Sequence, residues 1–244
     1  MLRNTKGIVL RSVKYGETSL ILSIFTEVLG LQSYMVKGIR SEKARSKRAG
    51  LLQVASLLDL VSEHKPNRQL QHIKEFQPAY IYQSLQEEIV KNSIAVYSVE
   101  LLSRLLPQDE VMEELFLFVY AYFLHLDQVP VREAANLPLL FTIRCGQYFG
   151  YNLSGSYSED TPYITPEEGI FTAQMPVSSS TLYEADAALL SRLSALEGLE
   201  QAGSVSMNAA QRNRLLDWYL QFLQYHTQHL GKLRSPDILR TILH

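Results

Sequence analysis

The sequence lacks the features typical of secreted and membrane proteins. It has one cysteine, Cys145, among 244 residues, which permits no internal disulfide and no cysteine-based zinc site. The first residues, 1–6, lack the apolar run of a signal peptide. The most apolar stretch, Leu115–Leu126, spans 12 residues, whereas a membrane-spanning helix needs about 20. These absences predict a soluble cytoplasmic protein with no membrane partner.

Catalytic motifs are also missing. Gly150 and Gly155 have the glycine spacing of a phosphate-binding loop, but Ser156-Tyr157 stands where that loop needs lysine and Ser/Thr. His226 and His229 are three residues apart, yet the predicted helix that carries them has no acidic residue beyond Asp217 to complete a metal site. We therefore expect no enzyme, no cofactor and no metal. A metal-dependent hydrolase using scattered carboxylates and histidines is an alternative that a nuclease or phosphatase assay would detect.

The small net charge of −2 hides two parts of opposite sign. Residues 1–80 contain 7 Lys and 6 Arg against 5 Glu and 1 Asp, a net charge of +7. Residues 81–244 contain 2 Lys and 8 Arg against 19 acidic residues, a net charge of −9. Such asymmetry indicates a module that binds a polyanion, joined to a part with another role.

The first part is typical of a small β-barrel. Short runs rich in Ile, Val, Leu and Phe are separated by turn residues, which predicts five strands: 7–13, 19–25, 31–36, 51–61 and 70–76. The five-stranded OB-fold has this size and strand count and commonly binds single-stranded nucleic acid. An SH3-like barrel is the competing interpretation.

A basic loop between the third and fourth predicted strands is the strongest functional signal. Six of its residues between positions 37 and 48 are basic, and one, Glu42, is acidic: Lys37, Arg40, Lys43, Arg45, Lys47 and Arg48. Such a cluster would neutralise several phosphates and release their counterions, which gives salt-sensitive and largely sequence-independent affinity. A solvated surface run is the ordinary alternative. The +7 charge of the surrounding barrel favours nucleic-acid binding.

Further candidates surround the predicted barrel mouth. Four more basic residues extend the patch: Arg11, Lys14, Lys65 and Arg68. OB-folds also stack bases on aromatic rings, and Tyr15 and Tyr34 are the better candidates, because Phe25 and Phe76 lie within apolar runs that indicate core positions. A structural role for the two tyrosines is an equal alternative.

After Pro78 the hydrophobic period becomes helical, which gives an α+β chain of two domains, 1–80 and 81–244. The helix predicted over 109–126 is apolar all round, so we expect it at the centre of a helical bundle. Residues 151–180 are rich in Ser, Gly, Pro and Thr, and the segments 163–165 and 170–172 predict a small hairpin.

Several motifs together resemble the bacterial RecO family of recombination-mediator and DNA-repair proteins. In the barrel part they are Glu17-Thr18-Ser19-Leu20, Phe25-Thr26-Glu27, Gly30, Val36-Lys37-Gly38-Ile39-Arg40 and Leu51-Leu52. In the helical part they are residues 100–106, Gly150-Tyr151, residues 168–171 and residues 230–235. The likeness runs along nearly the whole chain in the right order.

The resemblance implies an N-terminal OB-fold, a helical domain and no enzymatic turnover. It implies binding of single- and double-stranded DNA at the nucleoid and annealing of complementary strands. It also implies cooperation with RecR and RecF, contact with the acidic tail of the single-stranded-DNA-binding protein, and help in loading RecA. Many members of the family carry four zinc-binding cysteines after the Gly-Tyr segment, and residues 152–163 contain none. We therefore expect the lobe at about 151–180 to be held together by its hairpin and packing, without a zinc ion.

A generic OB-fold factor for single-stranded nucleic acid or RNA remains the alternative function. Competition between single-stranded DNA and RNA, or co-purification with ribosomes, would distinguish the two.

Overall fold

The computed structural model describes residues 1–39, 49–65, 68–228 and 230–243. By contacts these residues form two compact units. We call residues 1–83 with 106–124 the barrel unit, and residues 84–105 with 125–244 the helical unit. The predicted division into 1–80 and 81–244 follows chain order and stays a prediction. In space, residues 106–124 belong with the barrel.

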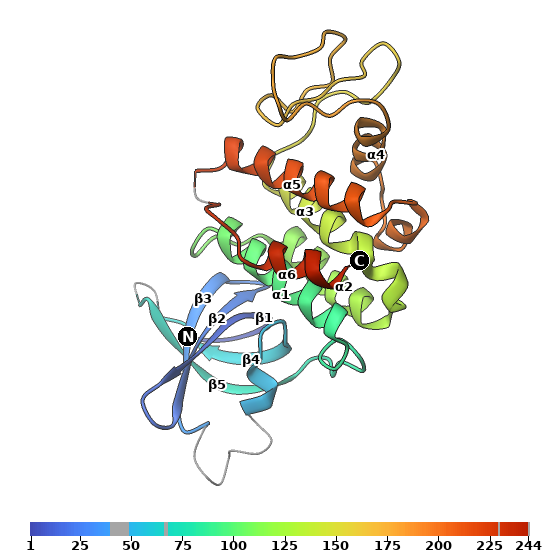
Figure 1. Ribbon diagram of the computed structural model, residues 1–244. Helices are drawn as coiled ribbons and strands as arrows, with labels where there is room; N and C mark the ends of the chain where they lie inside the picture. The colour runs from blue at the N-terminus through green and yellow to red at the C-terminus, as the bar shows by residue number, and fades with distance from the viewer. Residues whose placement is uncertain (40–48, 66–67, 229, 244) are drawn as a thin grey trace. The chain divides into compact units, whose positions relative to one another are not determined.

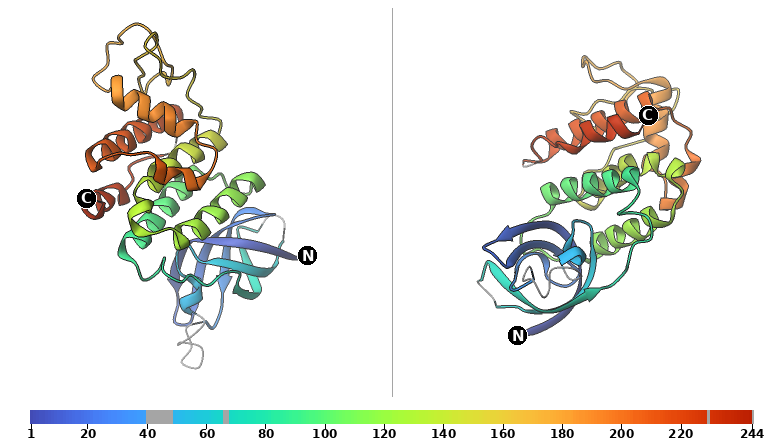
Figure 2. Two further views of the ribbon diagram at one scale, coloured as in Figure 1. Left: turned by 90° about the vertical axis from the view of Figure 1, so that its right-hand side faces the viewer. Right: turned by 60° about the horizontal axis from the view of Figure 1, so that its bottom comes forward.

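Five strands close into a barrel in the order β1-β2-β3-β5-β4 (Figure 1). Their bounds are β1 Leu2–Tyr15, β2 Ser19–Thr26, β3 Gly30–Val36, β4 Leu57–Glu63 and β5 Leu70–Pro78. All neighbours are antiparallel except β3 and β5, which are parallel. The strands curve round to form the barrel (Figure 2), whose core consists of Ile, Leu, Val and Tyr side chains. This barrel confirms the predicted OB-fold.

The prediction of a strand over 51–61 is wrong in its first half. Residues Ala49–Leu52 form a 3₁₀ helix, and β4 begins only at Leu57. Leu52 is apolar because its side chain fills the barrel core from this short helix. An apolar run of this length does not by itself separate a strand from a helical turn.

The turn between β2 and β3 depends on Gly30. Its φ of +66° lies in the left-handed region, which a residue with a Cβ adopts at a cost. A Cβ there would also clash with the backbone carbonyl of Glu110. That close approach exists because residues 108–110 run beside β3, where the Asp109 amide donates to the Leu31 carbonyl at 3.4 Å.

We expect Gly30→Ala to lower the free energy of unfolding by about 2 to 5 kcal/mol, because left-handed strain and a backbone clash add together. Gly16→Ala is the matched control, since Gly16 has a φ of +59° but open space where its Cβ would lie, with no other atom within 4 Å. It should cost only about 1 to 2 kcal/mol. Urea unfolding of both variants measures the difference, and equal losses would show that the approach of Glu110 is unimportant.

The prediction that a helix over 109–126 lies at the centre of a helical bundle is wrong. The helix found there is α2, Glu113–Gln128. Residues 113–124 belong to the barrel unit and do not form the centre of a bundle. Phe116 packs edge-to-face on Phe25 of β2, with ring centroids 5.4 Å apart. The ammonium of Lys6 lies 5.1 Å from the Tyr120 ring centroid. The helix still has an exposed side, where Leu117 is 52% exposed, so an apolar sequence shows neither which face of a helix is buried nor which partner buries it.

The helical unit is built on helices that pack side by side (Figure 2). Their bounds are α1 Ile89–Leu105, α3 Leu137–Tyr148, α4 Glu184–Ser194, α5 Ala209–His226 and α6 Ser235–Ile242, with 3₁₀ helices η2 Val131–Asn136 and η3 Leu199–Ser204. Helix α3 contacts both α1 and α5, and the Tyr97 hydroxyl of α1 shares a hydrogen bond with Thr142 of α3. Within the described part of the chain, no helix is long and apolar enough to cross a membrane.

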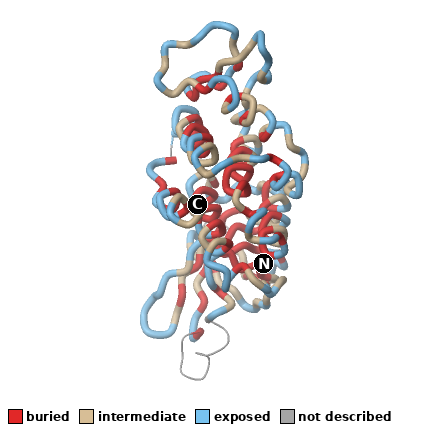
Figure 3. Tube along the Cα trace, turned by 45° about the vertical axis from the view of Figure 1, so that its right-hand side comes forward, coloured by how far each residue is buried: buried red, intermediate tan, exposed pale blue. Residues whose placement is uncertain are grey.

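The lobe after α3 has few regular elements and much exposed chain (Figure 3). The predicted hairpin is confirmed by the antiparallel bridge between Tyr163 and Thr172. The lobe is attached to α5, where the Trp218 indole donates to the Ser180 carbonyl at 2.9 Å. Gly169 lies against the Phe222 ring, which a Cβ would approach to 2.5 Å. Hydrogen bonds and aromatic packing therefore hold this segment.

Candidate nucleic-acid interface

The outer face of β1 and β2 carries two of the predicted contacts. Leu22 of β2 lies in the barrel core, so its neighbours along the strand, such as Ser23, face outward. Arg11 opposes Ser23, and Tyr15 opposes Ser19, and directly opposed residues project to the same face. The Tyr15 side chain is 54% exposed. Arg11 and Tyr15 therefore share the face on which OB-folds bind oligonucleotides.

Lys14 lies on the other face of β1. It opposes Leu20, which belongs to the core, and its side chain is exposed on the part of β1 that pairs with β2 but not with β4. Arg11 and Lys14 therefore do not form one patch, although they are close in sequence.

The structure contradicts Tyr34 as a stacking residue. Its side chain is 0% exposed and lies in the barrel core. Burial raises the pKa of its phenol, an effect that the neighbouring Ser62 hydroxyl partly offsets. A ring packed on both faces cannot stack on a base, so Tyr34 is a core residue.

The loop between β4 and β5 presents Lys65 and Arg68, whose side chains are both exposed. The buried amide of Gln71 organises this loop. Its Nε2 donates to the Lys65 carbonyl at 2.9 Å and to the Arg68 carbonyl at 2.7 Å, and its Oε1 accepts from the Lys65 amide at 3.0 Å. Gln71 thus fixes the backbone of two predicted contacts, a role that no pattern in the sequence indicates.

A further cation, Lys74 of β5, is absent from the residues predicted from sequence. Its Nζ lies 3.3 Å from a carboxylate oxygen of Glu63, and Lys65 Nζ lies 3.2 Å from the other. Hydrogen bonds from Lys65 and Lys74 lower the pKa of Glu63 below its usual value. Such exposed ion pairs contribute little net free energy, so a phosphate can compete with Glu63 for both lysines.

Lys37 begins the basic loop directly after β3, and its side chain is exposed. Gly38 follows with a φ of +71°, which explains the need for glycine at this point. Ile39 then enters the barrel core. The other predicted loop contacts lie outside the described residues: Arg40, Lys43, Arg45, Lys47 and Arg48.

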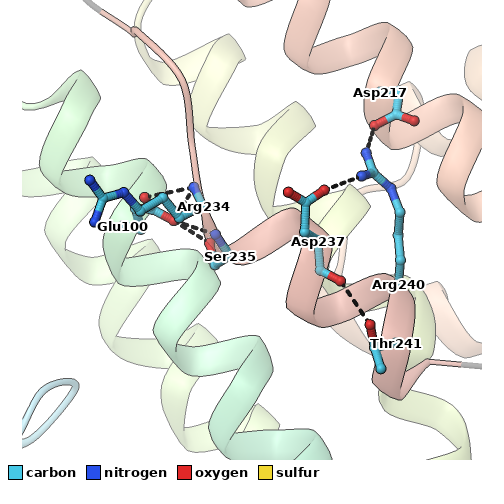
Figure 4. A network of polar contacts seen from close by, with 7 residues as sticks. All are labelled: Glu100, Asp217, Arg234, Ser235, Asp237, Arg240 and Thr241. Atoms are coloured by element: carbon cyan, nitrogen blue, oxygen red, sulfur yellow. Dashed lines mark hydrogen bonds and ion pairs between the residues drawn. The ribbon is translucent and has the colours of Figure 1, made fainter.

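In the helical unit, two motifs far apart in sequence meet at one carboxylate (Figure 4). Glu100 of α1 accepts hydrogen bonds from the amides of Arg234 at 3.0 Å and Ser235 at 2.8 Å, and from the Ser235 hydroxyl. Burial by itself would raise the pKa of Glu100, but these hydrogen bonds and the charge of Arg104 hold the pKa below its usual value. The contact fixes the start of α6 on α1.

Because the folded-state pKa of Glu100 is lowered, its contribution to stability is present above the ordinary carboxyl pKa and disappears as pH falls through the lowered value. We expect Glu100→Gln to lower the free energy of unfolding by about 1 to 3 kcal/mol at neutral pH. The difference from the natural protein should vanish once both side chains are uncharged in acid. Urea unfolding across a pH series measures this, with the exposed Glu159→Gln as control. A pH-independent difference would contradict the assignment.

Two further side chains of the helical unit, Trp218 and Cys145, are buried. Trp218 is stacked on Phe222 at an interplanar angle of 6° and is almost fully buried. Burial raises the pKa of the Cys145 thiol well above its usual value, which keeps it unreactive. Residues 1–39, 49–65, 68–228 and 230–243 contain no group of three or more His, Cys, Asp or Glu placed to hold a metal ion.

Comparison with known proteins finds two family models along the chain. The family model "Recombination protein O N terminal" matches residues 1–82, and "Recombination protein O C terminal" matches residues 86–236. The protein named DNA repair protein RecO in Flavobacterium johnsoniae is 31% identical over 238 residues, which cover 98% of each chain. Its namesake in Bacteroides fragilis is 30% identical over 246 residues and 99% of each chain. The one in Porphyromonas gingivalis is 26% identical over 244 residues and 98% of each chain. This chain belongs to the RecO family of DNA repair proteins.

Proposed function

We propose that the chain is a recombination mediator that binds single- and double-stranded DNA without enzymatic turnover. The observation that carries the proposal is the arrangement of cations round an OB-fold barrel. Arg11, Lys37, Lys65 and Arg68 are exposed on the barrel unit, and the sequence adds five more basic residues between positions 40 and 48. The absence of catalytic motifs from the sequence agrees with a binding role.

The DNA-contacting surface in this proposal has two parts. The described part comprises Arg11, Lys14, Tyr15, Lys37, Lys65 and Arg68. The loop part comprises Arg40, Lys43, Arg45, Lys47 and Arg48. Contacts to the phosphates position the strand and carry no sequence information, which suits a protein that must act on any damaged sequence.

Annealing follows from the same electrostatics. Two complementary strands repel each other until their phosphates are screened. A basic loop that neutralises several phosphates on both strands lowers this barrier. The bases of a strand that is held mainly through its phosphates stay available for pairing. The helical unit has 10 basic and 15 acidic residues, and its net charge of −5 repels DNA and favours the confinement of DNA to the barrel.

In this proposal the helical unit serves protein partners. Family membership and the unit's lack of net positive charge support that role. The partners are RecR, with RecF in gap repair, and the acidic tail of the single-stranded-DNA-binding protein. Their joint task is to load RecA on coated strands, at the nucleoid in the cytoplasm.

Annealing of complementary oligonucleotides coated with single-stranded-DNA-binding protein, without ATP, tests the proposal. We expect the chain to accelerate duplex formation on coated strands. A matched pair of RNA strands as competitor distinguishes a DNA mediator from a general single-strand binder. Tight DNA binding without any acceleration would contradict the mediator role and leave only an OB-fold binder.

A further inference from the structure

The barrel has an opening between β3 and β5. The two strands pair over three residues only, from Ser33↔Leu70 to Met35↔His72. Beyond this point β5 pairs with β4 alone, while the chain after β3 turns into the basic loop. The divergence leaves a hollow of about 430 Å³.

The hollow has an apolar floor and a charged rim. Met35, Ile73 and Phe76 line it and are half-buried. Lys37 and Lys74 also line it and are exposed. Its lining includes one carboxylate, Glu63, which is already paired with Lys74 and Lys65. An apolar floor between two ammonium groups is complementary to a base with phosphates on either side of it.

The hollow is continuous with the outer strand face. Val13 opposes Ile21, Ile21 opposes Met35, and Met35 pairs with His72. These opposed residues project to one face, so an apolar row crosses the strands and ends at the hollow. This row lies on the same face as Arg11 and Tyr15.

We propose that the hollow between β3 and β5 accepts one unpaired base of a single-stranded nucleic acid, with the flanking phosphates at Lys37 and Lys74. The inference rests on the proposed function and deepens it, because it makes the barrel distinguish unpaired from paired strands. A duplex keeps its bases stacked, and pulling one out costs free energy. A single strand offers its bases at little cost, so it gains a contact that a duplex of equal length lacks.

The test compares two variants that each replace an apolar residue by glutamate. Met35→Glu places a charge inside the hollow. Val54→Glu is the control, because Val54 is an exposed apolar residue of the same unit that does not line the hollow. Fluorescence anisotropy then gives the Kd for a single-stranded oligonucleotide and for its blunt duplex. We expect Met35→Glu to weaken single-strand binding about 10-fold relative to Val54→Glu and to leave duplex binding at the control value.

A backbone-only probe keeps the inference testable if Met35→Glu does not fold. An oligonucleotide of abasic sites has the same phosphates but no bases, so the natural protein should bind it about 10-fold more weakly than the normal strand. The folded Met35→Glu variant should show a smaller difference between the two strands, because only stacking on Tyr15 remains. Equal affinity of the natural protein for the two strands would overturn the base site while leaving electrostatic DNA binding intact. Failure of the natural protein to bind either strand or duplex would overturn the proposed function itself.

Discussion

Neutralising the six basic residues between Lys37 and Arg48 is expected to weaken binding of single-stranded DNA more than about 10-fold at low salt. The substituted residues are Lys37→Gln, Arg40→Gln, Lys43→Gln, Arg45→Gln, Lys47→Gln and Arg48→Gln. Each phosphate contact on a single strand releases about 0.7 counterion, so the plot of log affinity against log salt should become shallower by up to ~4. Titrations of a labelled oligonucleotide at several salt concentrations measure both quantities.

A control with the same loss of charge separates the loop from net charge. Six exposed basic residues of the helical unit serve for this purpose: Arg104, Arg132, Arg192, Arg214, Lys232 and Arg234. Replacing all six by Gln also removes six positive charges, but it leaves the barrel unchanged. We expect this variant to keep nearly the full salt slope. If the two variants lose affinity and slope equally, the loop has no special role.

The barrel was predictable because alternation and turn residues act locally. Strands β2, β3 and β5 each begin within one residue of the predicted start, and β1 contains the whole predicted segment 7–13. The order of elements is also as predicted. The exception, 51–61, shows the limit. Leu52 fills the core from a 3₁₀ helix. A buried position favours an apolar side chain whether it lies in a helical turn or in a strand, so the sequence does not separate the two.

The exposure of the candidate cations Arg11, Lys37, Lys65 and Arg68 was predictable from the sequence, but their arrangement was not. Charged side chains are rarely buried, so their exposure follows from composition, while the predicted contacts between positions 40 and 48 stay a prediction. Alternation along a strand places Arg11 and Lys14, three residues apart, on opposite faces, but composition did not show which of them faces outward, because that depends on a register shift between Val9 and Arg11. Composition also did not show that Tyr34 is inside, because an aromatic residue with one polar atom suits either a core or a surface. The choice of the outward face of β1 and the burial of Tyr34 both arise from pairing between strands, which no local pattern encodes.

Helix α2 illustrates the same limit at the level of tertiary structure. Its apolar sequence predicts burial, and burial is what the structure shows for Phe116 and Tyr122. The partner is the barrel, where Phe116 meets Phe25. Any apolar surface would satisfy the helix equally well, so the choice of partner requires the three-dimensional fold.

The helical unit contains a buried polar network. It joins residues 84–91, at the start of α1, to Asp127 near the end of α2. The Asp127 side chain, 3% exposed, accepts hydrogen bonds from the amides of Ser84 and Leu85, each at 2.8 Å. Lys91, 4% exposed, donates from Nζ to the Ser84 hydroxyl at 2.7 Å and to the Asp127 carbonyl at 2.6 Å. The network satisfies buried amides and a buried ammonium group together.

We expect Asp127→Ala to lower the free energy of unfolding by about 3 to 5 kcal/mol, because it removes the acceptor of two amides and a negative charge close to a buried ammonium group. Asp127→Asn keeps an oxygen acceptor and loses only the charge. Its free energy of unfolding should therefore lie between those of Asp127→Ala and the natural protein. Gln128→Ala, at the exposed next position of the same helix, should change stability by less than about 0.5 kcal/mol. Chemical denaturation gives the free energy of unfolding of each of the three variants and so ranks them by stability. An Asp127→Ala loss no larger than that of Gln128→Ala would mean that water replaces the carboxylate, and that the amides of Ser84 and Leu85 do not depend on it.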